Sequence, residues 1–185
     1  MMFSNEDIKR AIAKGDLIFS PFSENAIRAA GIVLHLGPDL LKPLPGRTVD
    51  LKKRIAPEYQ EIKIADDAPY ILAPSEFLLA ATFEKVSVGA SLGFFIEGRS
   101  TLARVGLTIV QTAMLVYPGH KDRPVTLELA NHGPNPIALY PKMKIARAVV
   151  FELRSPATEN YDDYGKYRGQ KSVGAPVFEN EFMED

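Results

Sequence analysis

"LGFFIEGRSTLARVGLTIVQTAMLVY", residues 92–117, places a polar segment between two apolar runs. The apolar runs are typical of β-strands. The segment between them, residues 96–106, holds two arginines, two hydroxyls and a carboxylate framed by glycines. A packed strand would exclude most of these side chains, and an ordinary surface turn requires none of them. The stretch therefore predicts two strands joined by a turn whose polar residues need an explanation.

The same alternation of short apolar runs with Pro, Gly and Asp clusters continues along most of the chain. The runs are residues 32–37, 47–51, 59–65, 69–74, 76–86, 92–98, 106–117, 124–131, 136–141 and 144–153. Many short strands at this spacing predict a mainly β fold, as an antiparallel sandwich or barrel. No internal repeat or low-complexity segment interrupts the series.

Helical signals are confined to the N-terminal part. Ser4 and Asp7 form a weak capping box, and Gly15 is a typical helix end, so we expect a helix between them. An apolar stripe supports it, formed by Ile8, Ala11 and Ile12. A second short helix is expected at residues 23–31, with Ser23 as N-cap and Gly31 as the stop.

Length and composition limit the kinds of protein this can be. The 185 residues suit one well-buried domain. The 22 basic and 23 acidic residues nearly balance, so net charge predicts no nucleic-acid or anionic-membrane surface. The chain has no cysteine, and its three histidines lack the spacing of a zinc site. No signal peptide or membrane span is evident, so we expect a soluble cytoplasmic protein.

From residue 155 the chain becomes polar, rich in Tyr, Gly and charge, and poor in aliphatic residues. Taken alone, residues 155–185 are typical of an arm that either stays mobile or becomes ordered on a ligand or a neighbouring subunit.

The polar segment has two interpretations. If residues 99–104 form one helical turn, Ser100 and Arg104 lie on the same face of it. Its free backbone N–H groups and hydroxyls would then suit an anion such as phosphate. Alternatively, this is a capped surface turn whose arginines pair with Glu97 or Glu128. The spacing alone leaves both open.

Residues 124–131, PVTLELAN, carry a second candidate. Strand alternation puts Val125, Leu127 and Leu129 on one face and the intervening residues, Glu128 among them, on the other. If that second face is in solvent, Glu128 is an ordinary surface carboxylate. If it lines a pocket, burial would raise the pKa of Glu128 and suit it to proton transfer.

These stretches together resemble the dCTP deaminase family, within the trimeric dUTPase-like superfamily. EGRSTLARVGL resembles the family segment E-G-R-S-S-L-A-R-L-G, and QTAMLVYPGH resembles T-A-x-x-I-D-P-G-[FW]. VTLELANHGPNPIALYPKMKIARAVVFEL and YDDYGKYRGQKSV also resemble family segments, the latter through its K-Y-x-x-Q pattern. The resemblance runs in order along nearly the whole chain, with a loose region around residues 38–66.

The resemblance implies a fold, an assembly and a reaction. The fold would be a distorted jelly-roll-like β domain of the dUTPase-like (β-clip) type, one domain over residues 1–185, with residues 155–185 closing over the active site. The assembly would be a homotrimer with active sites between subunits. The reaction would be hydrolytic deamination of dCTP to dUTP and ammonia without metal in the chemistry. Mg²⁺ would accompany the triphosphate, and dTTP is expected as an inhibitor. The absence of cysteine fits, since zinc-type nucleobase deaminases use cysteine ligands.

The resemblance also implies residue roles. Glu128 would move the protons, while Ser100, Arg104 and the backbone carbonyl of Ala113 would hold the attacking water. The substrate-binding residues would be Arg99, Ser100, Thr101, Leu102, Ala103, Arg104, Tyr117, Thr126, Leu127, Glu128, Arg147, Tyr161, Lys166 and Gln170.

The chain departs from the family pattern at several positions. Tyr117 replaces the Asp of I-D-P-G, which argues against dUTP hydrolysis, and Arg147 replaces a Gln near the nucleotide. Val33 and His35 replace an Asp and an Arg, and two glycines are lost at Lys142 and Ala146. Two alternatives follow: a non-catalytic nucleotide-binding or regulatory member of the superfamily, and a dUTPase-type pyrophosphatase.

Overall fold

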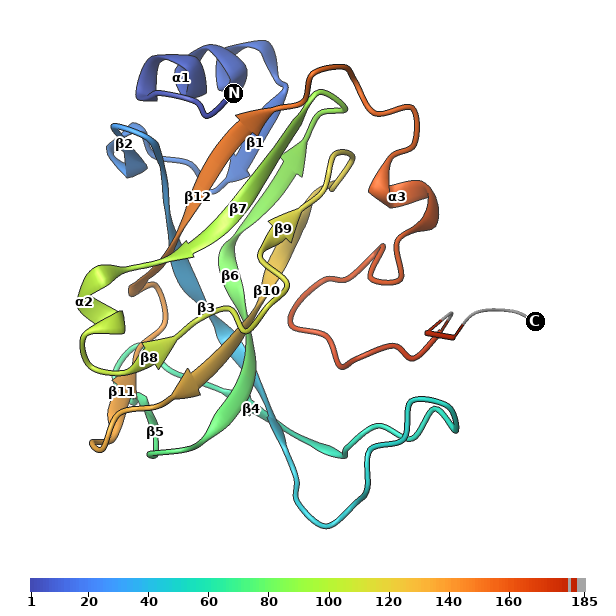
Figure 1. The fold of residues 1–185 in the computed structure, drawn as a ribbon. Coiled ribbons are helices and arrows are strands. Elements are labelled where there is room, and N and C mark those ends of the chain that lie inside the picture. The colour runs from blue at the N-terminus through green and yellow to red at the C-terminus, as the bar shows by residue number, and fades with distance from the viewer. Residues whose placement is uncertain (180, 183–185) are drawn as a thin grey trace.

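Antiparallel strands make up most of the computed structural model, which describes residues 1–179 and 181–182 (Figure 1). In chain order the elements are α1 (Asn5–Lys14), β1 (Leu17–Ser20), the 3₁₀ turn η1 (Glu24–Ala26), β2 (Ile27–Arg28), β3 (Gly31–Pro43), β4 (Tyr59–Lys63), β5 (Tyr70–Leu72), β6 (Phe77–Val88), β7 (Leu92–Gly98), α2 (Ser100–Ala103), β8 (Leu107–Thr108), β9 (Leu115–Val116), β10 (Arg123–Asn131), β11 (Ile137–Leu139), β12 (Lys144–Glu152) and α3 (Tyr161–Tyr164).

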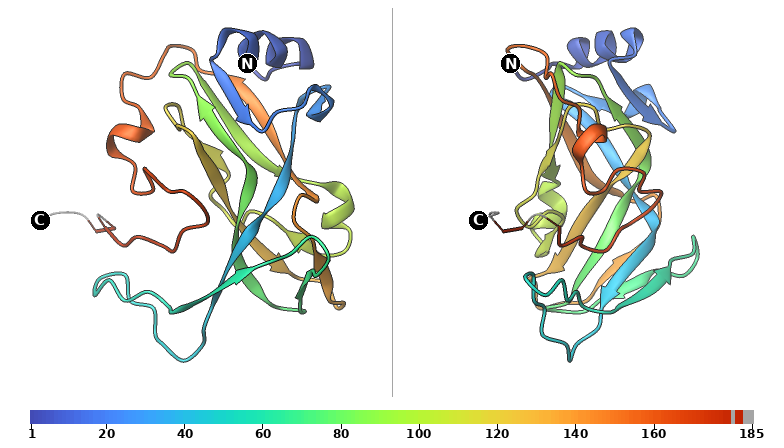
Figure 2. Two further views of the ribbon diagram at one scale, coloured as in Figure 1. Left: turned by 180° about the vertical axis from the view of Figure 1, so that it is seen from behind. Right: turned by 90° about the vertical axis from the view of Figure 1, so that its right-hand side faces the viewer.

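Ten of the strands form one sheet that curls around the core, as the front and turned views show (Figures 1 and 2). Its order is β8-β10-β6-β3-β12-β7-β9, with β1 on β6 and both β2 and β4 on β3, and β11 pairs with β5 separately. The long strand β3 joins the two halves of the curl, because it pairs with β12 along its first part and with β6 along its second. The prediction of a mainly β fold is confirmed.

Alternating aliphatic side chains of the long strands fill the core. Leu34 and Leu36 of β3, Leu78 of β6, and Leu127 and Leu129 of β10 are all fully buried. Each buried leucine contributes about 1.5–3 kcal/mol relative to an exposed one. The pattern predicted for residues 124–131 is confirmed, and it fixes which side chains of β10 face away from the core.

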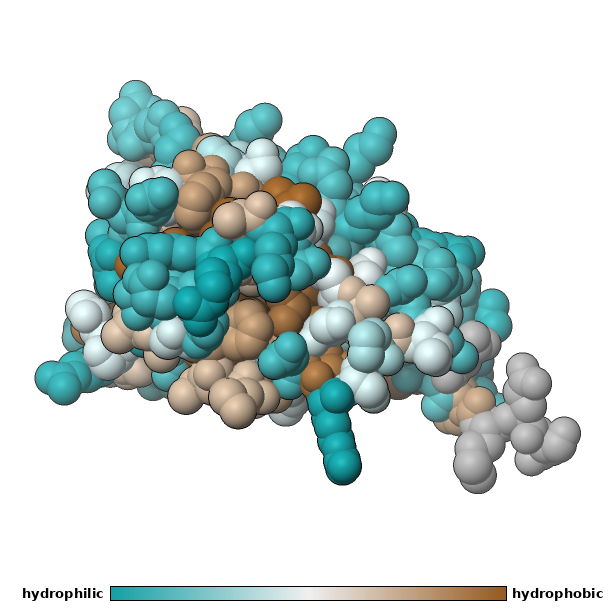
Figure 3. Space-filling view, turned by 90° about the horizontal axis from the view of Figure 1, so that it is seen from above, coloured by the Kyte–Doolittle hydropathy of each residue, from teal (hydrophilic) through white to brown (hydrophobic). Residues whose placement is uncertain are grey.

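Helix α1 covers one end of the curled sheet and has the predicted boundaries. Ser4 Oγ accepts a hydrogen bond from the Asp7 N–H, and Asp7 Oδ2 accepts one from the Ser4 N–H. Gly15 ends the helix at φ 78°, and Ile8 faces the core. The surface at this end is mainly hydrophilic, with a patch of hydrophobic residues between the polar ones (Figure 3). No helix in the described residues is both long and apolar enough to cross a membrane.

The prediction of a second helix at residues 23–31 is wrong, except for the single 3₁₀ turn η1 at Glu24–Ala26. Ser23 makes no side-chain cap hydrogen bond. Ile27 and Arg28 instead pair with the start of β3, so Gly31 begins a strand rather than ending a helix. Sequence periodicity missed this because burial of Ile27 in the core favours the strand.

Two expected strands also differ. Residues 47–51 form a loop instead of a strand, with an isolated bridge between Asp50 and Ile55, and Val49 and Leu51 are each 45% exposed. Their apolar side chains have no core to face, and Asp50 Oδ1 accepts a hydrogen bond from the Lys53 N–H in a local turn. Residues 106–117 contain only the two-residue strands β8 and β9, separated by a loop.

The turn after α2 depends on two glycines in contact. Gly106 has φ 88°, and a Cβ there would lie 2.3 Å from the Gly133 backbone nitrogen. The loop that carries Gly133 is held by buried Asn131, whose Oδ1 accepts the Gly133 N–H at 2.9 Å. The position of α2 on the body is therefore set by backbone-to-backbone packing that admits no side chain.

We expect Gly106→Ala to lower the melting temperature clearly more than Gly15→Ala, as measured by thermal unfolding. Both substitutions place alanine at positive φ, which costs about 1–2 kcal/mol. Only at Gly106 does the new methyl group also meet backbone, since nothing lies within 4 Å of a Cβ at Gly15. Equal losses in the two variants would show that the glycine contact does not position α2.

Candidate active site

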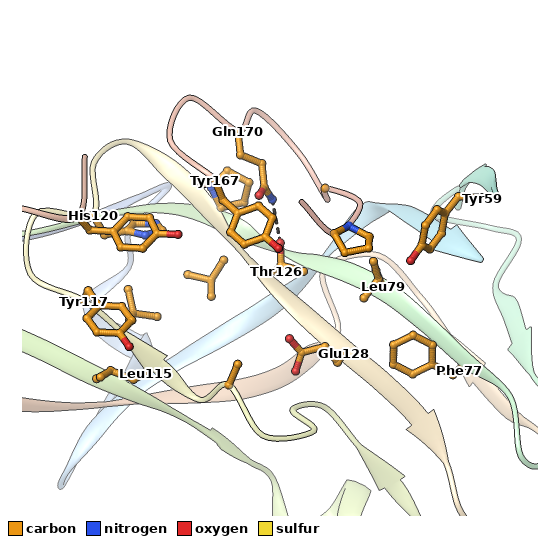
Figure 4. Close-up of a pocket in the computed structure, with 17 residues that line it drawn as sticks. Tyr59, Phe77, Leu79, Leu115, Tyr117, His120, Thr126, Glu128, Tyr167 and Gln170 are labelled. Atoms are coloured by element: carbon orange, nitrogen blue, oxygen red, sulfur yellow. Dashed lines mark hydrogen bonds between the residues drawn. The ribbon is translucent and has the colours of Figure 1, made fainter. Parts of the chain in front are cut away.

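The main candidate site is a cavity of about 520 Å³ between the body and the C-terminal segment (Figure 4). Residues of β6, β9 and β10 line one side, and residues between Tyr161 and Pro176 line the other. Most of the lining is apolar, with a few polar groups among aromatic and aliphatic side chains. This size and composition are typical of a pocket for a small organic ligand.

Glu128 projects into this cavity from β10 (Figure 4). Its neighbours Leu127 and Leu129 face the core, so strand alternation turns the carboxylate the other way. Glu128 Oε2 accepts a hydrogen bond from the Gln111 N–H at 3.0 Å. Burial raises the pKa of the Glu128 carboxyl above its ordinary value, and this hydrogen bond opposes the rise in part. Of the two interpretations of Glu128, the pocket-lining carboxylate is the one observed.

The loop between β8 and β9 supplies the groups next to Glu128. Gln111 bonds to Glu128 twice, through its backbone N–H and through its side chain to the Glu128 carbonyl. Ala113 follows and lines the cavity. The Gln111 N–H thus bonds to a side-chain carboxylate and not to a strand carbonyl, so the backbone ladder does not continue through residues 106–117 as their apolar composition predicted.

Tyr117 forms an aromatic wall with Tyr161 of α3. The two rings stack with centroids 5.7 Å apart and an interplanar angle of 12°. Arg123, only 3% exposed, lies over the Tyr161 ring at 5.2 Å and pairs with Asp162. Burial raises the pKa of the Tyr161 phenol, so it stays protonated at neutral pH. The start of the C-terminal segment is thereby attached to the body beside the cavity.

Farther along the segment, Gln170 reaches into the cavity. Its Nε2 donates to Thr126 Oγ1 at 2.8 Å, on the same strand face as Glu128. Lys166 pairs with Glu181 and does not line the cavity. Among the predicted residues, the structure therefore brings together Ala113, Tyr117, Thr126, Glu128, Tyr161 and Gln170. Residues 180 and 183–185 of the predicted arm lie outside the described residues.

Helix α2 lies elsewhere on the same chain, away from the C-terminal segment (Figure 1). Residues 100–103 form the predicted helical turn, with Ser100 and Thr101 exposed. Ala103 and Arg104 border a separate depression beside residues 133–138. Within the described residues the side chains of Arg99 and Arg104 make no hydrogen bond or ion pair, so the proposed pairing with Glu97 or Glu128 is not observed. Within one chain, Ser100 and Arg104 therefore lie apart from the cavity that contains Glu128.

Three other predicted residues do not face the cavity through their side chains. Leu127 is fully buried in the core, and Leu102 packs against the core from α2. Arg147 lies on β12 and pairs with Glu97 at 3.4 Å. Any contact of Leu127 with a ligand in the cavity would involve its backbone only.

Several residues that line the cavity were not among the predicted site residues. His120 and Tyr59 line the cavity, together with Tyr167 of the C-terminal segment. His120 follows a Pro-Gly pair, and Tyr59 begins β4, in the region of loose resemblance. Only the folded chain brings them together.

Comparison with known proteins identifies the relatives of this chain. The family model described as dCTP deaminase-like matches residues 2–153. A protein of Streptomyces coelicolor named "dCTP deaminase, dUMP-forming" is 34% identical, over 95% of this chain and 94% of its own length. A "dCTP deaminase" of Haloarcula marismortui is 33% identical, over 94% and 90% respectively.

A solved structure shows the same fold. The 2'-deoxycytidine 5'-triphosphate deaminase of Agrobacterium tumefaciens superposes with a TM-score of 0.61, covering 80% of this chain at 12% identity. The matched region spans about half of that longer protein, 47% of its chain. The expected β fold of a dCTP deaminase is confirmed by this likeness. A family model over most of the chain, and relatives one-third identical along nearly their whole length, show that the chain belongs to the dCTP deaminase-like family.

Proposed function

We propose that this protein hydrolyses dCTP, releasing ammonia from C4 of cytosine and leaving dUTP. The observation that carries the proposal is the partly buried Glu128 carboxylate in an apolar cavity of nucleoside size. The names of the relatives support dCTP as substrate.

Glu128 has the properties that such a reaction needs. A carboxylate with a raised pKa holds a proton more readily and still ionises at neutral pH, so it can both accept and return protons. It would take one proton from the water whose oxygen attacks C4 and pass it to N3. It would then take the remaining hydroxyl proton and deliver it to the amine as the C4–N bond breaks. The products are a uracil ring and ammonia, so every atom of water is accounted for.

The groups that hold the attacking water and the triphosphate are proposed to come from two chains. In the proposal the Ala113 carbonyl, on the same chain as Glu128, holds the attacking water. Ser100 and Arg104 reach the water from α2 of a second copy in a homotrimer. Two observations support this: no residue of α2 is among the described residues that line the cavity, and no lysine or arginine is among them either. The triphosphate with its Mg²⁺ therefore needs cations from elsewhere, such as Arg99, Arg104 and Lys166.

Tyr117 favours dUTP over dUMP as the product. Release of pyrophosphate requires a second water activated near the sugar and phosphates, and Tyr117 offers a phenol where a carboxylate would be needed. Its ring is already stacked on Tyr161. Since several relatives are named dUMP-forming, the alternative product has to be tested directly.

Incubation with Mg²⁺ and dCTP is expected to yield ammonia and dUTP in equal amounts without pyrophosphate. CTP, dCMP and dUTP in parallel reactions define the specificity. Pyrophosphate in step with ammonia would overturn the proposed product. No reaction with any nucleotide, with dCTP still raising the melting temperature, would indicate a nucleotide-binding protein without activity.

Glu128→Gln is expected to lower the deamination rate by at least about 10²-fold, because the amide cannot exchange protons. The same variant should be no less stable than the wild type at neutral pH. The folded-state pKa of Glu128 is raised, so its stabilising contribution is present at low pH and is lost as pH rises through that pKa. At neutral pH the charged group is therefore a cost that glutamine removes. Glu61→Gln, an exposed strand position, is the control that should change neither property.

Mixed assemblies test whether two chains build one site. Glu128→Gln and Arg104→Ala should each be inactive alone. Subunits of the two variants, dissociated together and reassembled, should regain part of the wild-type activity, because some sites then combine intact residues from both chains. Each variant taken through the same procedure alone is the control. Persistent inactivity of mixed assemblies would place Arg104 and Glu128 in the same chain's site, or in none.

A further inference from the structure

His120 occupies the cavity end that lies away from Glu128. It belongs to the loop between β9 and β10, is 9% exposed, and lines the cavity. In the close-up His120 and Tyr117 lie toward one end, while Glu128 and Phe77 lie toward the other (Figure 4). The proposed reaction gives Glu128 its role and gives His120 none.

The His120 ring is held in one tautomer. Its Nε2 lies 3.1 Å from the backbone oxygen of Arg123. A carbonyl oxygen only accepts hydrogen bonds, so Nε2 carries the proton. Burial, followed by the nearby Arg123 charge, lowers the pKa of His120 to about 4. At neutral pH the ring is therefore uncharged, and Nδ1 has a free lone pair.

Nδ1 is available to a ligand. It has no hydrogen-bond partner within residues 1–179 and 181–182. In the same residues, the side-chain atoms that are both sealed from solvent and unpartnered are Arg123 Nη2 and Arg147 Nε. Nδ1 of His120 is not among them, so it is not sealed from solvent; His120 borders both the cavity and the depression at Asn160 and Asp162. His120, whose Nδ1 is free to accept a hydrogen bond, thus lines one end of the cavity, and Glu128 lies nearer the other end.

We propose that His120 Nδ1 accepts a hydrogen bond from the 3'-hydroxyl of the nucleotide sugar, which makes His120 a specificity-determining residue. The proposal rests on the proposed function, because it places the reacting C4 of cytosine at Glu128. The sugar is then directed along the cavity, past the apolar lining toward His120. A 2'-deoxynucleotide has a single free sugar hydroxyl, at C3', and a neutral acceptor without hydrogen suits that donor.

The test compares dCTP with 2',3'-dideoxy-CTP, which lacks this hydroxyl. In the wild type we expect kcat/KM to favour dCTP by roughly tenfold, the effect of one buried hydrogen bond. His120→Asn places an amide oxygen near the position of Nδ1 and should keep most of this preference. His120→Gln keeps a donor for the Arg123 carbonyl but has no acceptor at the Nδ1 position, so its ratio should fall to about one.

If His120 has only a structural role, His120→Gln should keep the preference for dCTP better than His120→Asn does. Glutamine preserves the hydrogen bond to the Arg123 carbonyl, and asparagine does not. An unchanged ratio in His120→Gln would overturn the proposal, as would a wild type that does not distinguish the two nucleotides. Either of these two results is expected if Nδ1 faces the depression at Asn160 and Asp162, which His120 also borders, instead of the cavity.

Failure of the proposed function is detected separately, as the absence of ammonia from dCTP with wild-type protein. The comparison then uses the rise in melting temperature caused by dCTP and by 2',3'-dideoxy-CTP. An equal rise with the two nucleotides overturns the assignment of His120, and a larger rise with dCTP that is lost in His120→Gln supports it.

Discussion

The two-residue period of β10 is the constraint on which the site depends. Leu127 and Leu129 are fully buried, so Thr126 and Glu128 must face the opposite side of the strand. A shift of the β10 register by one residue would move the Glu128 carboxylate into the hydrophobic core and a leucine into the cavity. Burying an unpaired charge costs several kcal/mol, so the core itself excludes that register. The position of the candidate catalytic group is thus enforced by packing on the other face.

The pairing of β10 with β6 tolerates one irregularity, and a buried threonine compensates for it. The register shifts between Pro124 and Thr126, where the ladder would otherwise leave a donor without a partner. Thr82 Oγ1 accepts the Val125 N–H at 2.9 Å and donates to the Glu84 carbonyl at 2.7 Å. The strand can therefore bend at the edge of the cavity without an unpaired backbone group. Beyond the bend, β6 carries Phe77 and Leu79 of the lining, so one strand pair builds both core and site.

Features fixed by local chemistry were predictable from the sequence, and features fixed by tertiary contacts were not. The capping box at Ser4 and Asp7 and the sidedness of β10 depend on neighbours in the chain, and both predictions are confirmed. The Gln111 N–H bonds to the Glu128 carboxylate, a contact between distant parts of the sequence that no local pattern encodes. His120 likewise joins the site only because tertiary packing brings it to the same cavity as Tyr59 and Gln170. The resemblance to a family added Glu128, Ala113 and Tyr161 as a set, whereas their approach to one cavity required the fold.

The C-terminal segment begins as part of the fold and not as a free arm. Arg123 is buried, and the carboxylate it pairs with, Asp162, lies in that segment. A buried guanidinium deprived of its partner costs several kcal/mol, and the Tyr161 N–H also donates to the Pro118 carbonyl. The contact of Gln170 with Thr126 is different: a neutral hydrogen bond worth about 1 kcal/mol. A ligand that offers equivalent hydrogen bonds can replace it at little cost, whereas release of α3 would leave the buried charge of Arg123 without its partner Asp162. Residues 155–179 therefore divide after α3 into two parts. The part up to α3 is held firmly on the body, and the part after it makes contacts that a bound nucleotide can replace.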